Sequence, residues 1–214
     1  MPFTPRSSPV FLKQNTTMIA YIVLVVGLLT SFLGFWYSLS LSAEKERLRF
    51  EAVAKQTVLL VQNRMDAYRQ ILYDGTGLFD SSDDVNRAEW AAFVKSMKVN
   101  KNFPGIQGIG YSELVKPADK DRHVAKIRAE GFADYAIKPD GIRDIYTSII
   151  YLEPFNERNK RAFGYDMFSE AVRKAAMTKA MESGESAISG KVRLVQENSV
   201  DEQAGFLMYV PIYQ

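Results

Sequence analysis

The feature that most constrains this chain is a segment of 24 residues, Met18 to Leu41, that contains no charged side chain. A helix of that length would be about 36 Å long, enough to cross the hydrocarbon layer of a bilayer with some tilt. The small residues of "SLSLSA" at its end leave a cleaved signal peptide as the alternative. The apolar part of a signal peptide usually has only ~7–15 residues, so the sequence favours an uncleaved membrane helix over residues 18–41.

The charges on either side of this segment predict its orientation. Arg6 and Lys13 precede it without an acidic residue, whereas Glu44 and Glu46 are mixed with basic residues just after it. Because positive charge is enriched on the cytoplasmic side, we expect residues 1–17 in the cytoplasm and the rest outside the membrane. The predicted location is therefore the cell (inner) membrane, with one N-terminal span.

Composition excludes several classes of function. The net charge is +2 and no basic block stands out, which disfavours nucleic acid as a partner. There is no cysteine, and His123 is the one histidine, so disulfides, thiolate zinc sites and two-histidine metal sites are excluded. We expect no metal and no cofactor. His123 is predicted to lie on the solvent-exposed face of its helix.

A stalk helix is predicted over residues 42–79. Apolar residues recur there at spacings of three and four, from Phe50 to Phe79, and no proline interrupts them. Such a helix, running directly out of the membrane, can carry a mechanical change by translation or rotation. The apolar face can pack against a second copy of the chain, giving a homodimer, or against the chain's own domain, and the pattern alone does not separate the two.

Short helices alternate with strands over residues 80–214, which predicts a single α+β domain. The helices are expected to follow Asn86, where Glu89 completes a capping box, to run from Pro117 to Gly131, and to run from Ser169 to Ser183. The strands are expected within 103–115, on both sides of a turn at 139–141, near 187–196 and near 205–213.

No catalytic residue is assigned. The glycines of "GIQGIG" (105–110) precede a strand rather than open a helix, so they do not form a nucleotide-binding loop. No serine lies in a nucleophile elbow. We therefore do not expect this chain to be an enzyme by itself.

The order of several short motifs resembles the CHASE domain, the extracytoplasmic sensor module of membrane histidine kinases and nucleotide cyclases. The motifs are "FPGIQGIGY", "YLEP", "FGYDM", an alanine-rich helix, "ESGESAISGKVRLVQE" and "GFLMYVPIY", and the resemblance as a whole extends over roughly Leu72 to Tyr213. The resemblance implies a stalk helix that bears two PAS-like subdomains, with a small ligand in the membrane-distal one. It also implies that the sensor domain is incomplete at Gln214, and that a second span and a histidine kinase or diguanylate cyclase output follow.

The resemblance also implies ligand-binding residues. In the plant cytokinin receptors, the carboxylate of the segment matching "GYDM" binds an adenine-type ligand, and that position is Asp166 here. Strand backbone at the position of Ile188 adds contacts, while a threonine of those receptors aligns with Glu197 or its neighbour. Because of that difference, the ligand can be an adenine-type compound or a molecule of another class. Tyr111 and Tyr151 can line a pocket for a planar ligand or belong to the core.

The surroundings of Asp166 leave two roles open. The carboxylate is flanked by Tyr165, Met167 and Phe168, so it should be partly desolvated and need hydrogen-bond donors. A ligand amine can provide them, but so can the start of the next helix or the backbone of its own loop. The predicted function is a receptor that senses a small molecule; a membrane-anchored extracytoplasmic enzyme or adhesion domain is the alternative.

Overall fold

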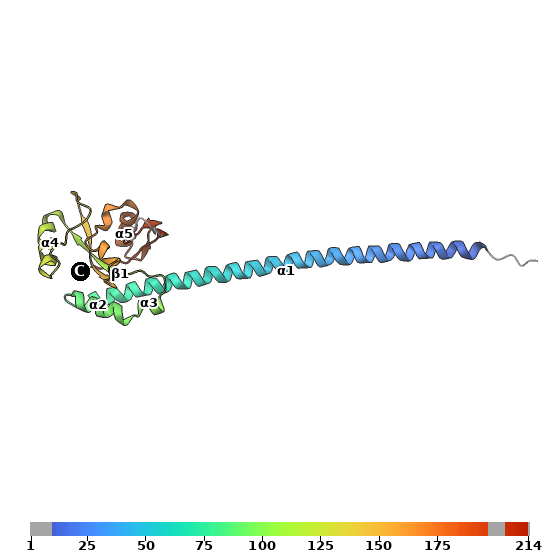
Figure 1. The fold of residues 1–214 in the computed structure, drawn as a ribbon, viewed down its shortest axis with the longest axis horizontal. Coiled ribbons are helices and arrows are strands. Elements are labelled where there is room, and N and C mark those ends of the chain that lie inside the picture. Colours follow the sequence, from blue (N-terminus) through green and yellow to red (C-terminus); the bar gives the residue numbers. More distant parts are fainter. Residues whose placement is uncertain (1–9, 197–203, 214) are drawn as a thin grey trace, which may run out of the picture. The chain divides into compact units, whose positions relative to one another are not determined.

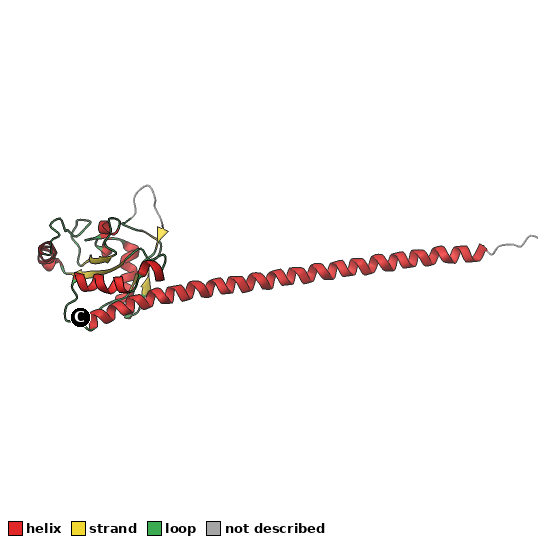
Figure 2. Cartoon of the chain, turned by 60° about the horizontal axis from the view of Figure 1, so that its bottom comes forward, coloured by secondary structure: helices red, strands yellow, loops and turns green. Residues whose placement is uncertain are grey.

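The computed structural model describes residues 10–196 and 204–213 (Figure 1). They belong to two units, residues 1–63 and residues 64–214. The helix α1 (Val10–Asp80) has residues in both units. No proline occurs within it, so nothing interrupts its backbone hydrogen bonds. The second unit adds short helices and strands to the end of α1 (Figure 2).

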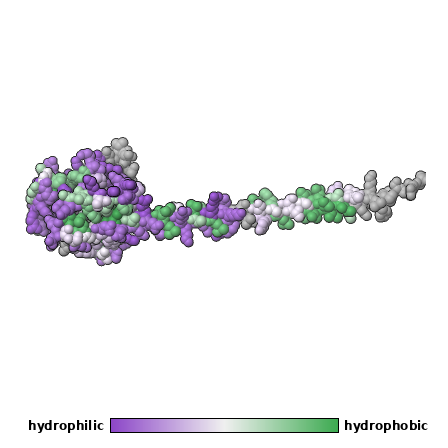
Figure 3. Space-filling view, turned by 90° about the horizontal axis from the view of Figure 1, so that it is seen from below, coloured by the Kyte–Doolittle hydropathy of each residue, from purple (hydrophilic) through white to green (hydrophobic). Residues whose placement is uncertain are grey.

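In the first unit, α1 carries the predicted membrane segment. Its large apolar side chains between Met18 and Leu39 are 52–70% exposed, and Figure 3 shows them as apolar surface along this part of the helix. In the part of the chain that the structure describes, one helix is long and apolar enough to cross a membrane. A helix segment that is apolar on all sides, and of which no part is buried among the described residues of its unit, matches the surroundings that lipid provides.

The second unit is built around two antiparallel strands, β1 (Ile109–Val115) and β2 (Tyr146–Glu153). Nearly every residue of β2 is buried, because other elements cover both of its faces. Ile150 and Tyr151 belong to a core with the end of α1 and with α2 (Arg87–Ser96). Ile149 and Leu152 belong to a second core that includes Met177 of α5 (Ala171–Ser183).

A β-bulge allows β2 to serve both cores. Tyr111 of β1 pairs with Tyr151, but the next residue, Ser112, pairs with Ile149, so Ile150 is skipped. An extra residue of this kind locally disrupts the ladder and re-aims side chains. Arg87 of α2 donates a hydrogen bond of 2.6 Å to the Ile150 carbonyl oxygen. The bulge is thereby tied to α2.

The "FGYDM" segment lies along the free edge of β2. Gly164 N donates to Ile149 O at 2.9 Å, and Ile149 N donates to Tyr165 O at 3.1 Å. Tyr165 in turn pairs with Lys138 as an isolated bridge. The strand expected before the 139–141 turn is reduced to that bridge, because Pro139 has no N–H with which to continue a ladder.

The other predicted helices are present, with one shifted start. α2 begins with the predicted capping box of Asn86 and Glu89. α5 starts at Ala171 rather than Ser169, because the Ser169 hydroxyl donates to Asp166 O and the Glu170 carboxylate caps the helix instead. The remaining helices are α3 (Val99–Asn102), η1 (Pro117–Asp119), α4 (Lys120–Ala129), η2 (Asn159–Ala162) and η3 (Met167–Ser169).

The two strands expected after α5 are instead four pieces of two residues each. β3 (Ala187–Ile188) pairs with β6 (Met208–Tyr209), and β4 (Val192–Arg193) pairs with β5 (Ala204–Gly205). Both pairings are antiparallel.

The predicted exposure of His123 is wrong. His123 is 5% exposed and lies on the same face of α4 as the buried Ile127, four residues further on. Its Nε2 is 2.8 Å from the hydroxyl of Tyr135, which is 2.7 Å from the hydroxyl of Ser148. The histidine is therefore part of a buried polar chain between α4 and β2.

Candidate ligand-binding site

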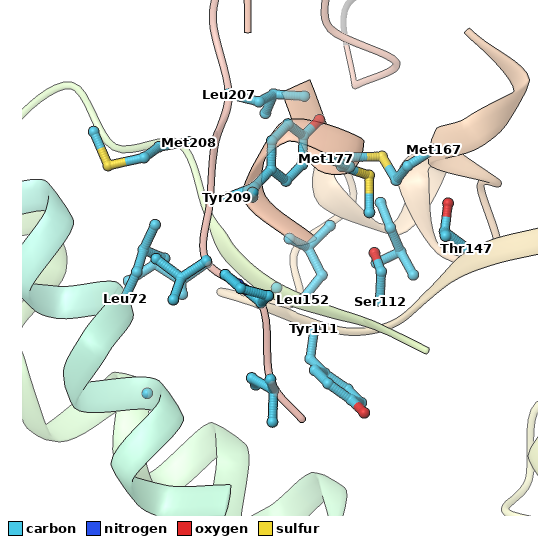
Figure 4. A pocket seen from close by; sticks show the side chains of 18 of the residues that line it. Leu72, Tyr111, Ser112, Thr147, Leu152, Met167, Met177, Leu207, Met208 and Tyr209 are labelled. Carbon is cyan, nitrogen blue, oxygen red and sulfur yellow. The ribbon is translucent and has the colours of Figure 1, made fainter. Parts of the chain in front are cut away.

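A cavity of about 580 Å³ lies within the second unit, and its size is that of a small-molecule site. Residues of α1, β1, β2, α5 and β6 line it (Figure 4). The labelled side chains, most of them apolar, are Leu72, Tyr111, Ser112, Thr147, Leu152, Met167, Met177, Leu207, Met208 and Tyr209. The three methionines give this wall adaptable shape.

Arg173 and Glu113 are the charged residues among those that line this cavity. Glu113 Oε2 is 3.4 Å from His123 Nδ1, which is long for a hydrogen bond but close enough for an ion pair. The contact with the His123 ring lowers the pKa of the Glu113 carboxyl. The Glu113 carboxylate thus lies next to His123 of α4.

Arg173 is 3% exposed and sits in the first turn of α5. Its Nη2 donates to Arg193 O at 2.7 Å, and its guanidinium carbon is 4.8 Å from the centre of the Tyr165 ring. Tyr209 also lines the cavity, and its hydroxyl is buried without a hydrogen-bond partner among the described residues. Burial raises the pKa of Tyr209, so it is a neutral donor.

The predicted ligand residues lie in different surroundings. Tyr111 lines the cavity. Tyr151 is not one of the lining residues: it belongs to the core against which Tyr111 also packs, its hydroxyl donates to Val85 O at 2.8 Å, and burial raises its pKa to about 12. Ile188 of β3 is 50% exposed and is not one of the lining residues. Glu197 lies outside the described residues.

Asp166 is fully buried and takes donors from its own surroundings. Its Oδ1 accepts hydrogen bonds from Thr147 N at 2.8 Å, Thr147 Oγ1 at 3.2 Å and Phe168 N at 3.1 Å. Its Oδ2 is 3.4 Å from Arg143 Nη1 and makes no hydrogen bond among the described residues. Asp166 does not line the cavity, whereas Thr147 and Met167 do. This geometry matches the local role left open above; contact between Asp166 and a ligand stays a prediction.

Sequence reasoning missed Arg173 and Tyr209. One signal was available for Arg173: it is spaced by three, four and seven residues from Ala176, Met177 and Ala180, so it lies on the apolar face of its helix. A single basic residue on such a face is unusual and points to a specific partner. Tyr209 gave no comparable signal, because a tyrosine in a strand is most simply read as core.

The sequence comparison agrees with the fold. A family model described as the CHASE domain matches residues 83–214, more than half of the chain. The chain therefore belongs to the CHASE domain family, the extracytoplasmic sensory domains of signalling receptors. Among curated proteins, none is similar enough in sequence to count as a match.

Proposed function

We propose that this chain is the extracytoplasmic ligand-sensing part of a membrane receptor, and that a small molecule binds in the cavity and biases α1. One observation carries the proposal: Ile71, Leu72, Gly75 and Thr76 of α1 form part of the cavity wall. A ligand in this cavity contacts the helix whose earlier residues are the candidate membrane span. Its affinity for two positions of that helix would shift their equilibrium.

A second contact supports coupling between the cavity and α1. The Tyr73 hydroxyl donates to Glu185 Oε2 at 2.9 Å and accepts from Ser186 N at 3.2 Å. Ser186 directly precedes β3, and the partner of β3 is β6, whose Met208 and Tyr209 line the cavity. Movement of this strand pair on ligand binding would act on α1 through Tyr73.

Thermal unfolding of the full chain in lipid nanodiscs tests the proposal, with adenine-type compounds and other small metabolites as probes. We expect at least one compound to raise the unfolding midpoint saturably, because a ligand at 100 times its Kd stabilises the folded state by about 2.7 kcal/mol. Met177→Trp, which fills the cavity, should abolish the rise. Lys179→Ala, on the exposed side of the same helix, should preserve it. A rise that survives Met177→Trp, or no rise with any compound, would contradict the proposal.

The proposal extends to parts of a receptor that this sequence does not contain. A second span and a cytoplasmic histidine kinase or diguanylate cyclase would turn the movement of α1 into a signal. The reading frame beyond Gln214 tests this extension. An apolar run of about 20 residues followed by an output domain supports it. A stop codon there argues for an anchored extracytoplasmic protein instead.

We also propose that α1 pairs with a second copy of the chain. Residues 44–63 of this helix carry apolar side chains that are 50–74% exposed, and no other described element of this unit covers them. These exposed side chains are Leu48, Phe50, Val53, Val58, Leu59, Leu60 and Val61. Of these, Phe50 and Val61 lie with Ala54 and Thr57 on one stripe at spacings of three and four, and such a stripe is stabilised by packing against an equivalent helix.

Single cysteines test the pairing, since the chain has none of its own. Ala54→Cys and Val61→Cys are two turns apart on the predicted contact face, so we expect oxidant to cross-link each variant into dimers. Lys55→Cys and Gln62→Cys, one residue further on, should give at least about fivefold less dimer, because disulfide geometry demands close Cβ atoms. Equal yields at all four positions would argue against a defined helix pair.

A further inference from the structure

The guanidinium of Arg173 is buried without a carboxylate close enough to neutralise it fully. Among the described residues, the one carboxylate within ion-pair distance is that of Glu170, whose Oε2 is 3.8 Å from Arg173 Nε. Both oxygens of Glu170 already accept hydrogen bonds, from Val172 N and from Arg173 N, each at 3.0 Å. A charge in such a position is unfavourable unless another group pairs with it.

The hydrogen-bonding capacity of Arg173 is also largely unused. One oxygen acceptor, Arg193 O, binds Nη2, while Nη1 meets the weak acceptor Met167 Sδ at 3.8 Å. Nε makes no hydrogen bond among the described residues. Guanidinium groups typically bind carboxylates with two parallel N–H groups, so these free donors suit an oxyanion.

Tyr209 supplies a second unused donor at the same cavity. Its hydroxyl is buried without a partner among the described residues, and it lines the cavity together with Arg173. Tyr209 and Tyr165 both pack against the core cluster that contains Met167, and Arg173 contacts Met167 and the Tyr165 ring. Two unsatisfied donors in one mostly apolar cavity indicate a missing acceptor.

A second cavity, of about 510 Å³, shares Arg173, Leu194 and Val195 with the first. It is also lined by Lys191 and Arg193, with Glu170 as its one acidic lining residue. Arg173 thus lies at the border between an apolar cavity and a basic one. Basic walls raise the local concentration of anions.

We infer that the ligand of the first cavity is a small carboxylic acid, whose carboxylate binds Arg173 and Tyr209 and whose apolar body contacts the methionines and leucines. The inference rests on the proposed function, because it names the class of molecule that the sensor binds. The carboxylate supplies both the missing charge and the missing acceptors.

Matched pairs of acids and amides test this inference on the full chain in nanodiscs. The probes are phenylacetate with phenylacetamide, and hexanoate with hexanamide, titrated by calorimetry and by unfolding midpoint. We expect at least one acid to bind tenfold or more tightly than its amide, because hydrogen bonds to charged groups contribute more. Tyr209→Phe removes one hydroxyl and should weaken the acid about five- to twentyfold while leaving the amide unchanged.

Arg173→Met should reduce acid binding by tenfold or more, whereas Lys179→Met on the exposed side of α5 should not change it. If Arg173→Met does not fold, Tyr209→Phe and the comparison of acids with amides decide the matter. Equal affinity of acid and amide, acid binding that is unchanged in Tyr209→Phe, or no binding of either acid overturns the inference. Binding of neutral probes alone overturns the inference but leaves the sensor proposal standing, whereas no response to any small molecule removes both.

Discussion

Gly164→Ala is expected to lower the free energy of unfolding by about 3–5 kcal/mol, because it combines backbone strain with a steric collision. Gly164 has φ +82°, in the left-handed region that favours glycine. An added Cβ would collide with the backbone carbonyl oxygen of Ala136. Ala136 lies just before Lys138, which pairs with Tyr165 at the edge of the sheet. Neither residue 136 nor residue 164 can therefore move away without breaking this pairing. Urea unfolding of the full chain, followed by tryptophan fluorescence, measures the effect.

Gly184→Ala is the matched control. Gly184 also has positive φ, +71°, at the end of α5, but an added Cβ would meet nothing within 4 Å. We expect a loss of only about 1 kcal/mol, the cost of the left-handed conformation by itself. Equal losses in the two variants would show that the "FGYDM" segment does not pack against residue 136 as the structure has it.

Asp166→Ala is expected to lower the free energy of unfolding by about 3–5 kcal/mol, since it removes a fully buried carboxylate that accepts hydrogen bonds from Thr147 and Phe168 and forms an ion pair with Arg143. The substitution leaves Thr147 N without its acceptor and Arg143 without its carboxylate. Urea unfolding of the full chain measures this loss. Asp166→Asn keeps one oxygen in nearly the same shape and should lose clearly less. Similar small losses in both variants would mean that the carboxylate is not a structural acceptor.

The asparagine variant also tests the role of Asp166 in ligand binding. If Asp166 binds a ligand amine as well, a folded Asp166→Asn protein should bind adenine-type compounds about 1.5–3 kcal/mol more weakly, the value of a hydrogen bond to a charged group. Calorimetry on the folded variant measures this difference. Unchanged affinity would restrict Asp166 to its place in the loop.

Local signals in the sequence were enough to predict α1, α2 and α5. The uncharged segment, the apolar spacing up to Phe79, the capping box at Asn86 and the glycine after α5 each act over a few residues, and the structure has helices at these places. The family resemblance rested on motif order along the chain and is confirmed by the family match over residues 83–214.

The features that the sequence did not predict depend on contacts between residues far apart in the chain. The exposure of His123 depends on Tyr135 and Ser148, twelve and twenty-five residues away, so its charged neighbours in sequence were misleading. The strand before Pro139 is reduced to a bridge at Lys138, whose backbone pairs with residues 164–166, which follow β2 in the chain. The cavity depends on α1, β1, β2, α5 and β6 meeting in space, and periodicity within one segment contains no information about that.

The bulge at Ile150 limits which parts of the second unit can move against one another. With both faces of β2 buried, a slip of one residue against β1 would exchange the two cores, so the pair acts as a rigid plate. The short pairs β3–β6 and β4–β5 have few hydrogen bonds to break and can shift at low cost. Under the proposed function, the plate would be the stationary reference, and the C-terminal strand pairs would be the part that a ligand displaces against it.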